Sequence, residues 1–176
     1  MSEPLLSYLL SFPPKMPEAI WLVPVIVLAI LGWTAFKDAL TGRVPDILLA
    51  FGFVGALGAS LWGEGQSLAT KRLIVAGVAV FVLVIINAVY FRLARRDAFG
   101  FGDVKWSGLA AFMFGLEILF WTWCVAAWLG VIWFIIRKGV GFLWPRFRSE
   151  SYIHFVPFLF MGLIVSSFKD MLLKLL

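Results

Sequence analysis

Residues 73–91 read LIVAGVAVFVLVIINAVYF, an uncharged run in which Asn87 is the one strongly polar side chain. A bilayer core of about 30 Å needs roughly 20 helical residues to cross it, and this run meets that length. The 176-residue chain is 62% hydrophobic and 14% charged, whereas about 25% of residues are charged in an ordinary soluble domain. A soluble domain of this size could not bury so much apolar surface. The sequence therefore predicts an all-α integral membrane protein.

Further apolar segments flank this run, separated by stretches that contain Gly, Pro or charged residues. The fourth segment is short, because a helix of its length rises only about 20 Å, and its first residue is Asp103. Residues 20–176 are read as one six-span membrane domain, and residues 1–19 as a short N-terminal interfacial segment. The predicted transmembrane helices are Ile20 to Phe36, Ile47 to Trp62, Leu73 to Phe91, Asp103 to Gly115, Ile118 to Ile136 and Phe155 to Phe168.

The distribution of lysine and arginine predicts the orientation, because cytoplasmic loops carry an excess of these residues. One side receives ten of the 15 basic residues, and the other side receives Lys15, Lys71, Arg72, Lys169 and Lys174. We therefore expect the loops after spans one, three and five in the cytoplasm and both termini in the periplasm. The basic residues form short clusters between apolar runs rather than one stripe, so membrane lipid is an expected partner and nucleic acid is not.

Two aspartates stand at ends of predicted spans on the cytoplasmic side. Asp38 follows the first span and Asp103 opens the fourth. An ionised carboxylate at membrane depth costs several kcal/mol, which makes it a candidate for function. Two such groups can share one proton, so that one activates a water while the other polarises a carbonyl. The plainer alternative is that each acid is a solvated helix end.

The residues around each aspartate favour the functional interpretation. Asp103 lies in Gly100-Phe101-Gly102-Asp103-Val104-Lys105, where the glycines leave the backbone open to close approach by a substrate strand. Asp38 is followed by Val44-Pro45-Asp46. This combination resembles the type IV prepilin peptidases, whose second catalytic motif is Gly-x-Gly-Asp-x-Lys. In that family the first aspartate precedes an Ile-Pro-Asn-like triplet.

The resemblance implies an aspartic endopeptidase with Asp38 and Asp103 as catalytic residues and with Gly100, Gly102, Lys105 and Pro45 supporting the motifs. It implies substrates that are prepilins or pseudopilins, which have a short basic leader and a long apolar helix. Cleavage is expected at the cytoplasmic face of a bacterial inner membrane. The sequence departs from the family pattern at Asp46, where Asn is usual, and at Trp106, where Leu is commoner.

No cofactor or metal is expected. The single cysteine, Cys124, lies in an apolar run and cannot form a Cys-x-x-Cys site. The larger bifunctional prepilin peptidases carry a cysteine-rich insert and also methylate their product. No such insert precedes the first span here, so we expect a compact enzyme that only cuts.

Two other classes of function remain open. A non-catalytic component of a pilus or secretion machine would tolerate loss of either aspartate. A small proton-coupled transporter would use the aspartates as a proton relay. Among other polar residues, His154 is interpreted as a surface residue and Lys105 either as a partner of Asp103 or as a cation reaching the interface. Because helix N-termini favour negative charge, we assign the base to Asp103 and the shared proton to Asp38 as a hypothesis.

Overall fold

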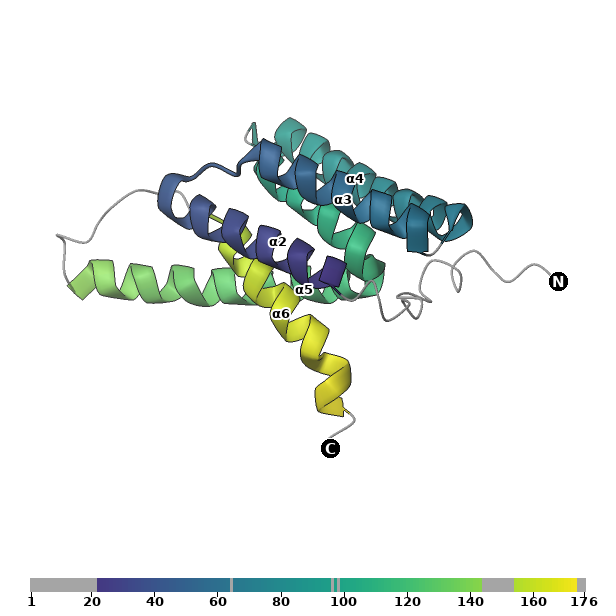
Figure 1. The fold of residues 1–176 in the computed structure, drawn as a ribbon. Coiled ribbons are helices and arrows are strands. Elements are labelled where there is room, and N and C mark those ends of the chain that lie inside the picture. Colours follow the sequence, from purple (N-terminus) through teal and green to yellow (C-terminus); the bar gives the residue numbers. More distant parts are fainter. Residues whose placement is uncertain (1–21, 64, 96, 98, 144–153, 174–176) are drawn as a thin grey trace.

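The computed structural model describes residues 22–63, 65–95, 97, 99–143 and 154–173, and the described residues form helices joined by short turns (Figure 1). The predicted segment 1–19 lies outside them. The described part of the chain contains no strand, which confirms the all-α prediction. The helices are α2 (Leu22–Thr41), α3 (Asp46–Gly63), α4 (Gln66–Ala94), α5 (Phe101–Leu143) and α6 (Val156–Leu173).

Four of these helices, α2 to α5, are long and apolar enough to cross a membrane, and α6 contains a shorter apolar helix over Val156–Phe168. Many large apolar side chains point outward along them, including Phe51 and Trp128. An outward-facing apolar surface of this kind is stable against lipid and not in water. The chain is therefore a multi-pass membrane protein, while the count of six spans stays a prediction.

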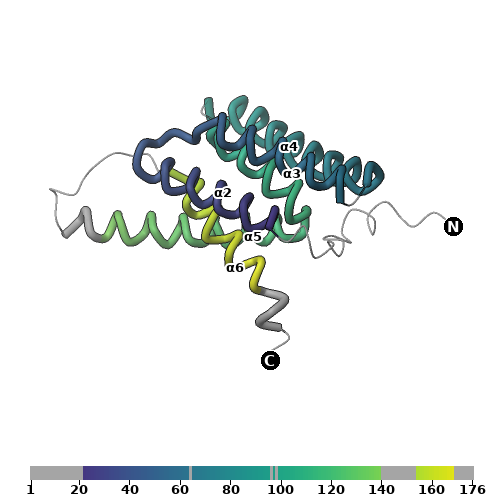
Figure 2. The backbone as a smooth tube through the Cα atoms, in the orientation of Figure 1, coloured from purple at the N-terminus to yellow at the C-terminus, as the bar shows by residue number. Residues whose placement is uncertain are grey.

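Helix α5 contains both the fourth and the fifth predicted span, with a break between them. Gly115 has φ 84° and ψ 172°, a conformation that interrupts the helix and that glycine tolerates. Beyond the break, the indole Nε1 of Trp123 donates a hydrogen bond of 3.2 Å to Ser107 Oγ, although 16 residues separate them. In a straight helix that separation would be about 24 Å. The two halves of α5 therefore fold back on each other, and Figures 1 and 2 show them running in different directions.

A buried arginine stabilises this break. Arg72 lies inside α4 with no exposed surface, and its guanidinium donates to the carbonyl oxygens of Phe112 at 3.2 Å and Met113 at 3.0 Å. These carbonyls end the first half of α5, where backbone acceptors lose their helical partners. A cation at a helix C-terminus is also electrostatically favourable. The predicted start of the third span at Leu73 was therefore wrong, because α4 begins at Gln66 and contains Arg72.

The core lies where α2, α4, α5 and α6 meet. In α2 the buried residues recur at helical spacing and end with Asp38, so one stripe of this helix faces inward. Gly162 of α6 sits directly against α5, where an added Cβ would overlap the carbonyl oxygen of Thr122. The largest buried apolar residues of this core are Val27, Leu31, Val75, Trp106, Leu109, Phe112, Leu159 and Leu163.

The role of Arg72 predicts that Arg72→Met destabilises the fold. The change would leave the carbonyls of Phe112 and Met113 without their side-chain donor, at a cost of about 1–3 kcal/mol for each buried acceptor left unpaired. Thermal unfolding of the purified protein in detergent measures the effect. Lys71→Met is the matched control, because it removes the neighbouring cation from a partly exposed position. Equal melting temperatures for the two variants would contradict a capping role for Arg72.

Candidate active site

Asp38 is held at the end of α2, in its last turn. Gly42 has φ 64° and its N–H donates to the carbonyl of Asp38 at 2.8 Å, which ends the helix in a left-handed cap. The Asp38 side chain closes the buried stripe of α2 and is only 6% exposed. Helix α2 thus presents a carboxyl group inside the bundle rather than to solvent.

Asp103 is held in the first turn of α5 and is 7% exposed. Its Oδ2 accepts a hydrogen bond of 2.9 Å from the backbone N–H of Gly100, just before the helix begins. A side chain in the first turn that reaches back to the preceding N–H satisfies one of the donors that every helix start leaves unpaired. The carboxyl group of Asp103 is thereby fixed in orientation by its own helix.

The structure brings these two aspartates together from separate helices. Their carboxyl groups are close enough for their charges to interact. The register of α2 against α5 is set by Trp106, whose indole Nε1 donates to the carbonyl oxygen of Leu31 at 3.3 Å. Both residues are fully buried. Trp106, a departure from the family pattern, is therefore a packing contact that joins the two helices carrying the aspartates.

The turn between α2 and α3 lies directly on the start of α5. A Cβ added to Gly102 would lie 2.7 Å from Val44 Cγ2 and 3.0 Å from Val44 Cβ. The absence of a side chain at Gly102 therefore admits Val44 and not the substrate strand that the sequence suggested. Gly100 differs, because it is exposed and its missing side chain leaves room beside Asp103.

Lys105 pairs with Asp46. The Lys105 Nζ lies 2.8 Å from Asp46 Oδ2 and 4.9 Å from the centre of the Phe101 ring. The two side chains are 36% and 66% exposed, and ion pairs as exposed as this contribute about 0–1 kcal/mol. The pair thus links the start of α3, immediately after Pro45, to α5 without adding much stability. It also gives Asp46 a partner within the protein.

His154 is the site residue that sequence reasoning missed. It lies just before α6, and its ring packs against Gly42, where an added Cβ would lie 2.7 Å from Cε1. Its charge interacts with Asp38, which also accepts a hydrogen bond from the backbone of Val156. The side chain is exposed, as expected, but its charge acts on Asp38. The one available signal was its position before the last span, on the same predicted side as Asp38.

Cys124 is a free, partly buried cysteine. Within the described ranges, no three His, Cys, Asp or Glu side chains are arranged to hold a metal ion. The expectation that the protein uses no metal or cofactor stays a prediction.

The fold and the site define a helical membrane protein with a pair of buried carboxyl groups at one end of its bundle. The chain belongs to the type IV leader peptidase family, whose pattern matches residues 25–144 and so includes both aspartates. Membership gives it a leader peptidase-like function and the general character of an aspartic-type protease, with roles in pili and secretion following from the family. No curated protein and no solved structure matches the chain.

The contact between Gly102 and Val44 predicts that Gly102→Ala destabilises the protein. Forced overpacking of a tight contact typically costs about 1–3 kcal/mol. Thermal unfolding in detergent should show a lower melting temperature, and Gly102→Ala combined with Val44→Ala should recover most of the loss.

The matched control for this experiment is Gly55→Ala, because a Cβ there meets nothing within 4 Å. Gly55 lies inside a helix, where alanine is favoured over glycine by about 1 kcal/mol. This control should be neutral or stabilising. Failure of Val44→Ala to rescue Gly102→Ala would show that the strain lies elsewhere.

Proposed function

We propose that this protein is an aspartic endopeptidase that removes a short basic leader from prepilins or pseudopilins at the cytoplasmic face of a bacterial inner membrane. The supporting observation is that Asp38 and Asp103, both buried and held on two different helices of a membrane protein, lie close enough for their charges to interact. Buried carboxyl groups are expensive in such a setting and are retained chiefly for function. Family membership supplies the reaction class.

The chemistry follows from two carboxyl groups that share one proton. The ionised member takes a proton from a water molecule, whose oxygen bonds to the scissile carbonyl carbon. The protonated member donates a hydrogen bond to the carbonyl oxygen and stabilises the charge that develops there. When the C–N bond breaks, the leaving amine receives a proton from the pair. The enzyme is proposed to cleave only, without methylating the new N-terminus.

The roles within the pair are a hypothesis that the surroundings support in part. Asp103 accepts the Gly100 N–H and lies at a helix N-terminus, where negative charge is favourable. This favours Asp103 as the base. Asp38 is also stabilised in its ionised form, by a hydrogen bond from the backbone of Val156 at the start of α6 and by the charge of His154. The assignment of the shared proton to Asp38 therefore stays a prediction.

The proposed orientation is supported by basic residues near the end of the bundle that holds the aspartates. Lys37, Arg43, Arg92 and Arg95 lie at the ends of α2 and α4, close to this end. Arg72, counted with the opposite side, is buried as a cap inside α4 and does not belong to a loop. The positive-inside tendency then favours a cytoplasmic site and periplasmic termini. No observation favours the transporter or the non-catalytic assembly component.

We predict that Asp38→Asn and Asp103→Asn each abolish cleavage of a prepilin in membranes, because each removes one of the two carboxyl groups that must share a proton. Asp46→Asn should keep activity, since its ion pair with Lys105 is exposed and weak. Glu117→Gln, an exposed acid beside the break in α5, is the control. Gel mobility of the substrate measures cleavage. Substantial cleavage by Asp103→Asn would refute the aspartic mechanism.

We predict that His154→Phe changes the pH profile of cleavage. Phenylalanine keeps an aromatic ring over Gly42 but removes the charge that interacts with Asp38. The cleavage profile of the variant should therefore be displaced along the pH axis relative to that of the unmodified enzyme. Rates measured from pH 5 to 8.5 test this. Superimposable profiles would show that the charge of His154 does not act on Asp38 during catalysis.

A further inference from the structure

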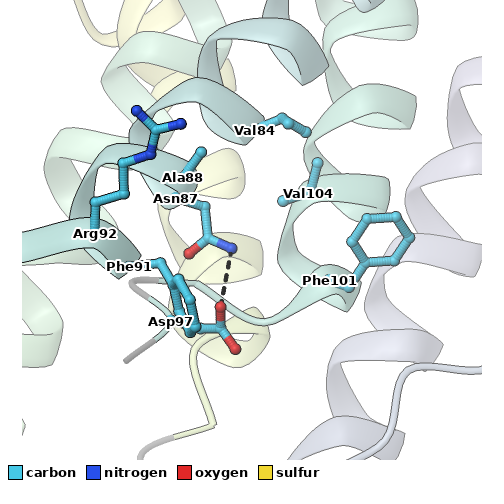
Figure 3. Close-up of a pocket in the computed structure, with 8 residues that line it drawn as sticks. All are labelled: Val84, Asn87, Ala88, Phe91, Arg92, Asp97, Phe101 and Val104. Carbon is cyan, nitrogen blue, oxygen red and sulfur yellow. Dashed lines mark hydrogen bonds between the residues drawn. The ribbon is translucent and has the colours of Figure 1, made fainter. Parts of the chain in front are cut away.

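A pocket that includes neither Asp38 nor Asp103 opens between α4 and the start of α5 (Figure 3), with a volume of about 410 Å³. Its polar side chains are Asn87, Arg92 and Asp97, and its apolar walls include Val84, Phe91 and Phe101. Pockets of about 300–1,000 Å³ are the size that binds small ligands. The site has no part in the chemistry proposed above, although Phe101 places it beside the helix turn that carries Asp103.

The charges in this pocket are of opposite sign and are not paired with each other. Figure 3 shows the Arg92 guanidinium and the Asp97 carboxylate on two sides of Asn87. Asn87 Nδ2 reaches Asp97 Oδ1 at 3.4 Å, a long hydrogen bond, and Asn87 Oδ1 accepts the Phe99 N–H at 3.2 Å. Within the described part of the chain, neither Arg92 nor Asp97 takes part in an ion pair. A ligand that carries both a positive and a negative group would satisfy both.

One apolar residue of the pocket, Val84, lies farther from the end of α4 than Arg92 does. Arg92 is in the last turn of α4, whereas Val84 precedes it on that helix by about 12 Å at 1.5 Å per residue. Val84, Phe91 and Phe101 are all exposed. On a membrane protein, exposed apolar side chains near a helix end lie against lipid at the boundary of the bilayer. The pocket therefore presents charge toward the headgroups and an apolar wall toward the acyl chains.

We propose that this pocket binds a zwitterionic aminophospholipid with a phosphoethanolamine headgroup. The Arg92 guanidinium matches the phosphate, with which arginine forms paired hydrogen bonds. The Asp97 carboxylate accepts hydrogen bonds from the primary ammonium. One acyl chain lies along Phe91 and Val84. A phosphatidylglycerol would match Arg92 and leave Asp97 unsatisfied. A phosphatidylcholine would match both charges but has no N–H to donate.

The test uses the full-length protein, stripped of lipid in detergent and offered equal amounts of phosphatidylethanolamine, phosphatidylcholine and phosphatidylglycerol with identical acyl chains. Native mass spectrometry counts the lipid retained. The unmodified protein should retain phosphatidylethanolamine in preference to the other two. Asp97→Asn should lower its preference over phosphatidylcholine by on the order of tenfold, the effect expected of one charge-assisted hydrogen bond.

Two further variants test separately whether the charge of Arg92 and the open volume of the pocket are needed for lipid binding. Arg92→Gln should weaken retention of all three lipids, because it removes the partner of the phosphate that they share. Val84→Trp should weaken retention by filling the pocket without changing its charges. Arg95→Gln is the matched control, because Arg95 is an exposed arginine at the same helix end that does not line the pocket. It should retain lipid as the unmodified protein does.

Equal retention of the three lipids by the unmodified protein would overturn the proposal. So would a phosphatidylethanolamine preference that survives Asp97→Asn and Val84→Trp. Displacement of the bound lipid by a soluble cationic peptide, with Asp97→Asn abolishing peptide binding, would assign the pocket to a peptide segment and overturn the lipid site. None of these results depends on whether the protein cleaves a prepilin.

Discussion

Backbone carbonyls in an apolar environment must have hydrogen-bond partners, and the break in α5 meets this constraint with a buried arginine. Gly115 ends the first half of α5 after a few turns, and Arg72 from α4 donates hydrogen bonds to the carbonyl oxygens of Phe112 and Met113. Asp103 lies in the first turn of this short first half. The second half folds back and is followed by α6, whose first residues lie beside Asp38. The geometry of the site thus depends on the break at Gly115, which lies at the opposite end of the first half of α5 from Asp103.

Close backbone contacts at the other end hold the two aspartates together. Gly102 leaves room for Val44, so the turn between α2 and α3 rests on α5. Trp106 joins α5 to the Leu31 carbonyl of α2, and these buried contacts are harder to replace than the exposed Lys105–Asp46 pair. Rigid support of this kind is what a proton-sharing pair requires, because the reacting groups must be oriented before the substrate arrives.

Much of this arrangement could be predicted from the sequence, because apolar length and charge are local properties. The predicted span Ile47 to Trp62 agrees with α3, and the predicted boundary after Gly115 coincides with the break in α5. The Gly-x-Gly-Asp motif and the aspartate before it resemble the motifs of a known family. This resemblance identified the two acids that the fold brings together.

The contacts that could not be predicted join residues distant in the sequence. An arginine at the start of an apolar run looks like a loop residue, and only the packing of α4 on α5 shows that Arg72 is a buried cap. His154 was dismissed for a similar reason, since its neighbour Asp38 lies on another helix. Asp46, at the start of α3, pairs with Lys105 of α5, which is 59 residues away in the sequence. No local pattern of residue types encodes these pairings.

The central claim is that Asp38 and Asp103 act as one unit. Residues that act as a unit in catalysis show strongly non-additive losses, because removing one already removes the function of both. The most direct measurement is the residual cleavage rate of the Asp38→Asn/Asp103→Asn double variant beside the two single variants, with each protein confirmed as folded. We predict that the double variant is no slower than either single variant. Losses that multiply in the double variant would show that the two carboxyl groups act independently, and would contradict a shared proton.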